Sequence, residues 1–269
     1  MGQKLGQHFL KNKKILHTIA GIVESRADET LIEVGPGHGE LTEKLKTQNA
    51  KCKIIAIEKD KILAEQLEKK FEKDKNIKIM CGDALLLLPE IVKKIRGNYI
   101  VVGNIPYYIT GYLFRTIQEL KKRPTRTVVM IQKEVAERIV KKSPQMNLLA
   151  ASVQYWADPK IIMNVSKKEF SPQPKIDSAV IELYTKKTHL KNNGGVEKKY
   201  YNTLNILFKQ PRKTIKNNIT LSYRTARGCN TQEKVVLKQI EEISVHAEGR
   251  PQDLRIEEIK KIAQIIHPK

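Results

Sequence analysis

The sequence predicts an α/β protein: a mainly parallel sheet of seven strands with helices on its faces, followed by a small all-helical domain. Two observations predict this architecture. Short β-rich apolar runs alternate with amphipathic stretches from residue 31 to about residue 184, and each run has the length of a single strand. Beyond a polar, glycine-containing stretch, only helical periodicity continues. The length of 269 residues suffices for one large core and a smaller unit.

The elements follow from where apolar residues recur. Helical spacing is clear over 61–71, where Ile62, Leu63, Leu67 and Phe71 repeat on one face and are expected to be core. Seven apolar runs are expected as strands: 31–35, 53–58, 77–81, 99–103, 127–131, 153–157 and 179–184.

A change of composition near residue 186 predicts the domain boundaries. We expect an amino-terminal catalytic domain over 1–186, a linker over 187–196 and a small helical RNA-binding domain over 197–269. Helical patterns cover 198–209, 232–243 and 253–266. From Lys187 onward the chain has 17 basic and 8 acidic residues, so this domain is expected to contribute to RNA binding.

The charge of the whole chain points to a polyanionic partner. Fifty Lys and Arg residues against 29 Asp and Glu residues give a net charge of +21, more than solubility requires. Nucleic acid is the natural candidate, although a lysine-rich proteome alone is an alternative. No apolar run is long enough for a membrane span. Cys52, Cys81 and Cys229 have no paired-ligand spacing, so neither a disulfide framework nor a metal site is expected. We expect a cytoplasmic monomer.

A glycine-rich loop is the first sign of a cofactor site. Gly35-Pro36-Gly37-His38-Gly39 follows an apolar strand and opens a helix, so a ligand can approach the backbone there. Glu58 ends the next strand, where a carboxylate can accept both hydroxyls of a ribose. The loop lacks the dinucleotide fingerprint because Glu40 takes the place of its last glycine.

Dinucleotide sites and S-adenosylmethionine sites share this geometry, and Asp83 helps to distinguish them. Gly82-Asp83-Ala84 follows the third predicted strand, and an Asp there can accept a hydrogen bond from the adenine amine of S-adenosylmethionine. The alternative for Asp83 is a helix N-cap. With Glu58 and the glycines in register, we expect S-adenosylmethionine as the cofactor, bound by Gly35, Gly37, Glu58, Asp83 and Ala84.

The tetrapeptide Asn104-Ile105-Pro106-Tyr107 predicts chemistry on an adenine amine. That amine is a poor nucleophile because its lone pair is delocalised, so hydrogen-bond acceptors must hold it in a pyramidal geometry. The Asn104 side-chain oxygen and a main-chain carbonyl at Ile105 or Pro106 can do so without a strong base. Pro106 fixes the backbone, and Tyr107 offers a flat face to an extruded base. The alternative is a simple turn after a strand.

The chain resembles the KsgA family of small-subunit ribosomal RNA adenine dimethyltransferases, nearly from end to end. The likeness includes several further segments: Leu5-Gly6-Gln7-His8-Phe9-Leu10, Ile57-Glu58-Lys59-Asp60, Gln132-Lys133-Glu134-Val135-Ala136 and 170–180, which begins Phe170-Ser171-Pro172. The resemblance implies a class I methyltransferase with a Rossmann-like fold. It also implies that the enzyme transfers two methyl groups to each of two adjacent adenines near the 3′ end of 16S ribosomal RNA.

The resemblance also implies residue roles. His8 and Leu10 would border the cofactor, Asn104 would contact the cofactor and take the target amine, and Phe170 would stack on the adenine opposite Tyr107. From its proline-rich surroundings alone, Phe170 is expected to be a buried anchor.

Two alternatives remain beside this function. One is the antibiotic-resistance group that dimethylates adenine in 23S ribosomal RNA; the segments 208–217 and 250–254 resemble the small-subunit branch instead. The other is a non-catalytic RNA-binding factor in ribosome assembly, against which Asn104 and Asp83 argue. A nicotinamide dehydrogenase would need a catalytic acid motif that the sequence does not offer.

Overall fold

A computed structural model describes residues 8–23, 29–191, 194–227 and 230–268. The chain divides into two compact units. The first comprises Met1–Glu137 and Ala157–Asn192, and the second comprises Arg138–Trp156 and Asn193–Lys269. The segment Arg138–Trp156 therefore groups with the helical unit, whereas the sequence pattern places it in the amino-terminal domain.

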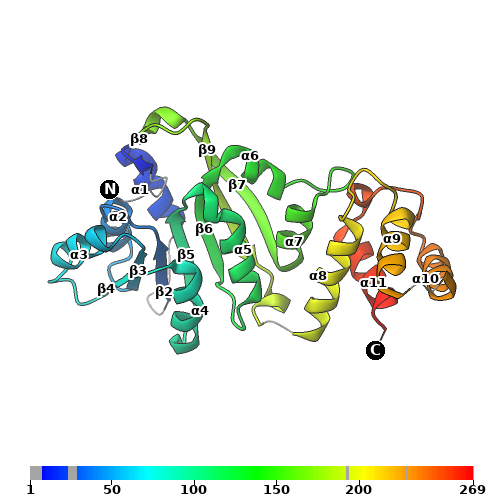
Figure 1. Ribbon diagram of the computed structural model, residues 1–269. Coiled ribbons are helices and arrows are strands. Elements are labelled where there is room, and N and C mark those ends of the chain that lie inside the picture. Colours follow the sequence, from blue (N-terminus) through cyan, green and yellow to red (C-terminus); the bar gives the residue numbers. More distant parts are fainter. Residues whose placement is uncertain (1–7, 24–28, 192–193, 228–229, 269) are drawn as a thin grey trace. The chain divides into compact units, whose positions relative to one another are not determined.

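The first unit is built on a seven-stranded sheet with the order β4-β3-β2-β5-β6-β9-β7 (Figure 1). The first five strands in this order are parallel, and β9 and β7 run antiparallel to them. The strands span Thr30–Val34 (β2), Lys53–Glu58 (β3), Ile77–Cys81 (β4), Tyr99–Asn104 (β5), Arg126–Gln132 (β6), Ala157–Val165 (β7) and Ser178–Thr185 (β9). The predicted fold class, a mainly parallel seven-stranded sheet, is confirmed.

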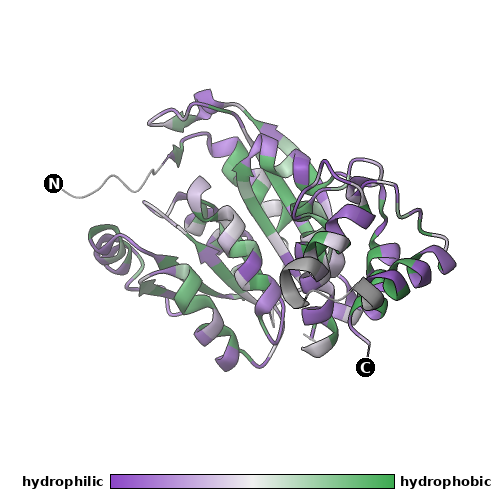
Figure 2. Cartoon of the chain, turned by 45° about the vertical axis from the view of Figure 1, so that its right-hand side comes forward, coloured by the Kyte–Doolittle hydropathy of each residue, from purple (hydrophilic) through white to green (hydrophobic). Residues whose placement is uncertain are grey.

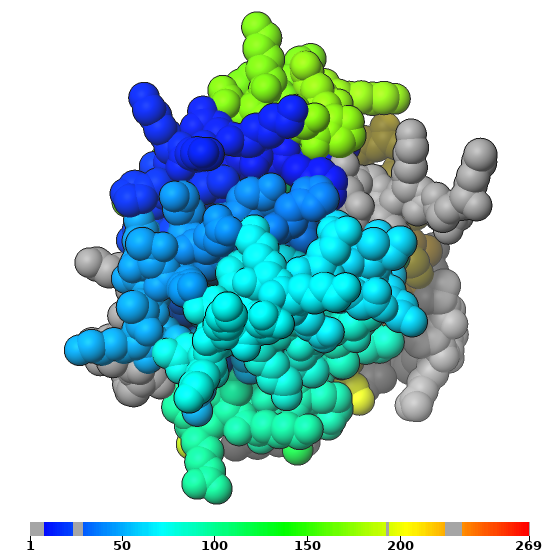
Figure 3. Space-filling view, turned by 90° about the vertical axis from the view of Figure 1, so that its left-hand side faces the viewer, coloured from blue at the N-terminus to red at the C-terminus, as the bar shows by residue number. Residues whose placement is uncertain are grey.

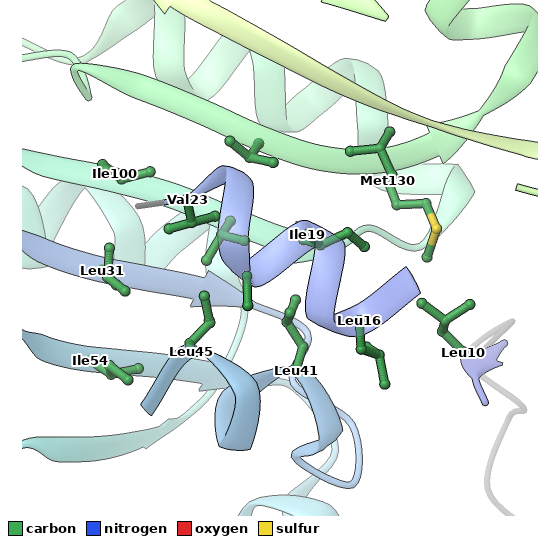
Figure 4. Close-up of a cluster of buried hydrophobic side chains, with 14 of the residues drawn as sticks. Leu10, Leu16, Ile19, Val23, Leu31, Leu41, Leu45, Ile54, Ile100 and Met130 are labelled. Atoms are coloured by element: carbon green, nitrogen blue, oxygen red, sulfur yellow. The ribbon is translucent and has the colours of Figure 1, made fainter. Parts of the chain in front are cut away.

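Helices cover the sheet between successive strands. They are α1 (Lys13–Ile22), α2 (Glu40–Gln48), α3 (Lys61–Lys70), α4 (Ala84–Lys94), α5 (Thr110–Glu119) and α6 (Lys133–Ile139), with a 3-10 turn η1 (Tyr107–Ile109) before α5. Leu16 and Ile19 of α1 and Leu41 of α2 point onto the strands and close one core with Leu31 and Ile100 (Figure 4). The strands of the sheet are mostly hydrophobic, as Figure 2 shows, because both faces are covered.

A second, two-stranded ribbon joins segments far apart in the chain. β1 (Phe9–Leu10) pairs antiparallel with β8 (Phe170–Ser171), and Leu10 lies opposite Phe170. The blue amino-terminal residues accordingly lie against the yellow-green segment in the space-filling view (Figure 3). The sequence pattern does not predict this ribbon, because two residues are too few to show periodicity.

The predicted strand Val153–Ala157 is wrong. Its residues up to Trp156 end helix α7 (Leu148–Trp156), and β7 begins only at Ala157. The helix is buried on nearly every side, so the amphipathic pattern that marks a helix is absent. The true strand contains Pro159 and a bulge between Ile161 and Met163, both of which an edge strand tolerates.

The second unit is all-helical, as expected. Besides α7 it contains α8 (Gly195–Leu207), α9 (Ile215–Arg227), α10 (Asn230–Glu242), the 3-10 turn η4 (Pro251–Asp253) and α11 (Ile256–Ile266). Tyr200 of α8 is buried, stacks on Tyr155 at 4.0 Å between ring centroids, and donates its hydroxyl to the carbonyl of Ala151 at 3.0 Å. Helix α9 is not among the predicted helices; Asn217, Asn218 and Thr220 weaken its sequence signal.

The residues predicted as a linker contain local structure. Lys187–His189 forms a 3-10 turn, η3, and the main-chain carbonyl of His189 accepts a hydrogen bond from Arg123 Nη1 at 2.8 Å. Asn192 and Asn193, like Cys229 and residues 5–7 of the amino-terminal motif, lie outside the described residues. None of the helices in the described ranges is long and apolar enough to cross a membrane.

Candidate active site

A pocket lies at the carboxyl ends of β2, β3 and β5, the edge where ligands of open α/β sheets bind. Eight of the predicted site residues line it: His8, Gly35, Gly37, Glu58, Asn104, Pro106, Tyr107 and Phe170. Phe9 and Ile105 complete the lining. Leu10, Asp83 and Ala84, which the sequence also assigns to cofactor binding, are not among the lining residues.

The glycine loop forms one wall of the pocket. Gly35 and Gly37 have φ angles of +69° and +61°, in the left-handed region that side chains rarely adopt. A Cβ at Gly37 would come within 2.8 Å of the Phe9 ring. The loop therefore needs glycine both for its turn and for the close approach of β1.

The Glu58 carboxylate ends β3 beneath this loop and is 4% exposed. Its Oε2 accepts the main-chain N–H of Gly37 at 3.0 Å, and its Oε1 accepts that of Asp60 at 2.9 Å. Burial raises the pKa of Glu58, and the backbone hydrogen bonds from Asp60, Gly37 and Lys59 oppose this. A carboxylate offers about four acceptor positions, so Glu58 keeps acceptor capacity for a ribose hydroxyl.

Asp83 is the N-cap of helix α4, the role that the sequence offers as the alternative to cofactor binding. Its Oδ1 accepts the N–H of Leu85 at 2.9 Å in the first turn of α4, and its Oδ2 accepts Lys59 Nζ at 2.9 Å. Burial opposes ionisation, but the hydrogen bonds from Lys59 and Leu85 prevail and lower the pKa of Asp83. Ala84 is the buried first residue of α4. An ionised Asp83 keeps acceptor positions for a further donor.

Asn104 is the last residue of β5, and its side chain has a fixed orientation. Its Nδ2 donates to the main-chain carbonyl of His8 at 2.9 Å. Because a carbonyl can only accept, this bond identifies which end of the amide is the nitrogen. Among the described residues no donor reaches the Asn104 Oδ1. The amide oxygen is therefore held as an open acceptor at the pocket.

Two features hold Asn104 in place. A Cβ at Gly103 would come within 2.3 Å of the carbonyl oxygen of Val34, so only glycine lets β5 approach β2 this closely. The N–H of Ile105 donates to the carbonyl of Met130 at 3.1 Å. These contacts fix the backbone on both sides of Asn104.

Tyr107 is held by a residue from another strand. Its hydroxyl lies 2.9 Å from Ser178 Oγ, the first residue of β9, and its ring centroid is 5.9 Å from that of His8. Burial raises the pKa of the Tyr107 phenol. The hydroxyl is therefore neutral at ordinary pH, and the ring is positioned as a neutral aromatic face.

The β1–β8 ribbon brings Phe170 to the pocket. Phe170 lines the pocket and is 5% exposed, and Leu10 opposite it belongs to the hydrophobic core. His8 Nδ1 lies 2.8 Å from the carbonyl oxygen of Pro172, and the N–H of Lys11 donates to the carbonyl of Glu169 at 2.9 Å. Phe170 is thus both a buried residue and part of the pocket wall.

Sequence reasoning gave no role to Phe9 and Ser178. Phe9 could have been found, because in an extended segment that buries Leu10 the preceding side chain points the other way, toward the pocket. Ser178 has no such signal. Its contact with Tyr107 depends on strand order, since β9 is two strands away from β5.

Comparison with known proteins places the chain among relatives that match almost its full length. The family model described as ribosomal RNA adenine dimethylase matches residues 2–253. Ribosomal RNA small subunit methyltransferase A of Dehalococcoides mccartyi is 33% identical over 258 residues, which cover 96% of this chain and 86% of that protein. The protein of the same name from Mycoplasma capricolum is 32% identical and covers 97% of this chain and 96% of its own.

Two solved structures share the fold of both units. A dimethyladenosine transferase from Plasmodium falciparum superposes with a TM-score of 0.78 at 25% identity, covering 95% of this chain and 96% of that one. The 23S rRNA methyltransferase ErmE superposes with a TM-score of 0.70 at 21% identity, covering 96% and 98% of the two chains. At that identity, the second likeness shows the fold alone.

Proposed function

Since the chain belongs to the ribosomal RNA adenine dimethylase family, we propose that it dimethylates the exocyclic amines of two adjacent adenines near the 3′ end of 16S ribosomal RNA, using S-adenosylmethionine. The observation that carries the proposal is the open Oδ1 of Asn104 at the pocket, oriented by the carbonyl of His8. An acceptor fixed in this way is what a neutral adenine amine needs.

The cofactor side of the pocket fits S-adenosylmethionine. Gly35 and Gly37 expose backbone, and the remaining acceptor capacity of Glu58 suits a ribose hydroxyl. Asp83 and Ala84 would receive the adenine of the cofactor, and His8 would border it, with Leu10 supporting that segment from the core. The cofactor supplies an electrophilic methyl group; the chain supplies the acceptors that orient its partner.

The target amine is held by two acceptors of the tetrapeptide. Asn104 Oδ1 takes one N–H. Of the two carbonyls that could take the other, that of Pro106 already accepts the N–H of Ile109 at 3.1 Å, whereas no main-chain N–H donates to that of Ile105 among the described residues. Ile105 is therefore the better second acceptor. Two accepted hydrogen bonds direct the lone pair of the amine away from the ring plane, so no strong base is required.

The base itself would lie between Tyr107 and Phe170. Both side chains line the same pocket, and both are fixed from behind, Tyr107 by Ser178 and Phe170 by its pairing with Leu10. Pro106 leads into η1 and sets the direction of the Tyr107 backbone. Rigid aromatic faces are how proteins hold an extruded base.

The net charge of the chain and the names of its relatives both support an RNA partner. The net charge of +21 provides the counterion-releasing cations that RNA binding uses, and the relatives named above are small-subunit methyltransferases. We assign catalysis to the unit that holds the pocket and a share of RNA binding to the helical unit. The protein would act as a monomer in the cytoplasm, on 16S ribosomal RNA or on an immature small subunit. Action on 23S RNA is the competing activity, and the likeness to ErmE supports it only at the level of the fold.

One experiment tests the proposal. The purified chain is incubated with methyl-labelled S-adenosylmethionine and either small subunits that lack the adenine methyl groups or large subunits, and the labelled bases are mapped. We expect label on two adjacent adenines of the 16S RNA, as dimethyladenosine. Label confined to 23S RNA would favour the competing activity, and no label with retained RNA binding would favour a non-catalytic assembly factor.

A further inference from the structure

An exposed stripe of side chains begins at the residue after Tyr107. Tyr108 is 52% exposed and Tyr112 is 65% exposed, although large aromatic side chains are usually buried. With Gly111 and Arg115 they follow the spacing i, i+3, i+4, i+7, so the four positions share one face of η1 and α5. We call this face the tyrosine stripe.

Helix α5 is packed normally on its inner face, so the exposure of the tyrosine stripe does not come from a poorly packed helix. Thr110, Leu113, Phe114 and Ile117 are all buried and bind α5 to the first unit. The helix therefore has an ordinary amphipathic pattern, and its outer face, which a soluble helix normally fills with charged residues, holds two aromatic rings instead. Both rings are therefore accessible to a partner outside the chain.

Three features of the tyrosine stripe suit a nucleic acid strand. A Cβ at Gly111 would meet nothing within 4 Å, so the space between the two rings is open. The tyrosines lie about 6 Å apart along the helix axis. A cation belongs to the same face: the Arg115 side chain is 74% exposed, and its Nε pairs with Glu119 at 3.0 Å, which leaves the other guanidinium nitrogens facing solvent.

We propose that Tyr108 and Tyr112 form a stacking surface for the unpaired RNA bases that adjoin the target adenine. The proposal rests on the function proposed above, in which one adenine enters the pocket beside Tyr107 while its neighbour stays outside. The neighbouring base then meets Tyr108, the next residue along the chain. Aromatic rings bind unpaired bases by stacking, whatever their sequence, and nearby cations take the phosphates.

The stacking surface gives the enzyme a way to work on two neighbouring adenines. The base outside the pocket is held ready while the first is methylated, so the strand need only shift by one nucleotide. The tyrosines do not touch the reacting atoms. They are positioning residues, and their loss acts on the binding of RNA and on the second adenine rather than on the transfer step.

The test compares two double variants of the full chain. Tyr108→Ala with Tyr112→Ala removes both rings, Tyr108→Phe with Tyr112→Phe keeps them, and Ile62→Ala, at an exposed apolar position of α3, is the matched control. We expect the alanine pair to raise KM for under-methylated small subunits at least tenfold, with kcat and the Kd for S-adenosylmethionine within about threefold of wild type. The phenylalanine pair and the control should resemble wild type.

Several results would overturn the proposal. An unchanged KM for the alanine pair would remove the stacking role, and an equal loss in the phenylalanine pair would assign the effect to the hydroxyls. A tenfold weaker Kd for S-adenosylmethionine without a change in RNA binding would mean that the rings cover the cofactor. A wild-type dimer that the alanine pair makes monomeric would identify a self-interface. Failure of the wild type to methylate RNA would instead contradict the function itself, which separates the two hypotheses.

Discussion

Under the proposed function the site has a cofactor half, which includes Asp83 beside the pocket lining, and a base half, and the two are built in different ways. The cofactor half comes from consecutive strand–loop–helix units, and its carboxylates Glu58 and Asp83 already accept hydrogen bonds from their own neighbourhood. The base half is assembled from distant segments that carry His8, Asn104, Phe170 and Ser178. There the amide oxygen of Asn104 stays open.

The difference indicates how each half works. Glu58 braces the glycine loop and Asp83 caps α4, so the cofactor half keeps its shape before anything binds, and changes there should appear as cofactor affinity. The base half depends on a short ribbon and single hydrogen bonds, so changes there should appear in the transfer step. Changes at Asn104, Glu58 and Tyr107 test this division, and a change at Glu33 tests the stability of the fold beneath the cofactor half.

The largest effect is expected in the base half. Asn104→Ala removes the acceptor that holds the amine, and we expect methyl transfer to fall at least about 100-fold, while the Kd for S-adenosylmethionine stays within about tenfold, or roughly 1.4 kcal/mol. Single-turnover transfer and calorimetric titration measure the two quantities. Asn104→Asp is the companion variant: it keeps an acceptor but cannot donate to the His8 carbonyl, so it should also lose activity. Full activity in either variant would contradict the assigned role.

The next effect is expected in the cofactor half. Glu58→Ala removes the acceptors for a ribose and leaves the N–H groups of Gly37 and Asp60 without their partner, so we expect the Kd for S-adenosylmethionine to rise tenfold or more. Transfer at saturating cofactor should change much less. Glu65→Ala, an exposed carboxylate of α3, is the control. If Glu58→Ala instead abolished transfer at saturation, the two halves could not be separated.

A third prediction concerns stability beneath the glycine loop. Burial raises the pKa of Glu33 to about 8, the hydrogen bond from Thr42 opposes this, and the neighbouring Glu58 and Glu40 add to it. Between about pH 4.5 and pH 8 the folded state holds a proton that the unfolded state releases. The free energy of unfolding should therefore fall by up to about 1.4 kcal/mol per pH unit as pH rises through this range.

Glu33→Gln isolates that contribution. The variant keeps the shape of the side chain and an acceptor for Thr42, but it cannot ionise. Its free energy of unfolding, from urea titrations at several pH values, should exceed that of wild type increasingly from pH 5 to pH 8. A constant difference across this range would mean that Glu33 does not titrate there.

The smallest effect is expected at Tyr107. Tyr107→Phe keeps the flat face and loses only the hydrogen bond to Ser178, which is worth about 0.5–1.5 kcal/mol. Methyl transfer should therefore fall no more than about tenfold, and Ser178→Ala should have a similar effect. A loss above 100-fold in Tyr107→Phe alone would show that the hydroxyl takes part in the chemistry.

The sheet was largely predictable because its central strands are continuous apolar runs. The pattern failed at the edge, where Val153–Trp156 ends a mostly buried helix and the true strand from Ala157 contains Pro159. Both errors share a cause. Periodicity reports how burial alternates along a segment, and neither a helix buried on nearly every side nor a bulged edge strand gives a regular alternation.

The sequence predicted which residues belong to the site but not all of the contacts that hold them. Asp83 also caps α4 and pairs with Lys59, and Leu10 packs in the core, while their places at the cofactor stay predictions. For Phe170 the two expectations are compatible. It is buried, as its proline-rich surroundings predict, and it also forms part of the pocket wall.

The sequence by itself determined the fold class, the glycine loop, Glu58 at the end of β3 and the tetrapeptide at the end of β5, because each depends on contacts between nearby residues and on strand periodicity. Only the tertiary structure decided which way the Asn104 amide points, what supports Tyr107 and how Phe170 reaches the pocket. Those depend on His8, Ser178 and the β1–β8 ribbon, contacts between residues that are far apart along the chain and leave no local pattern.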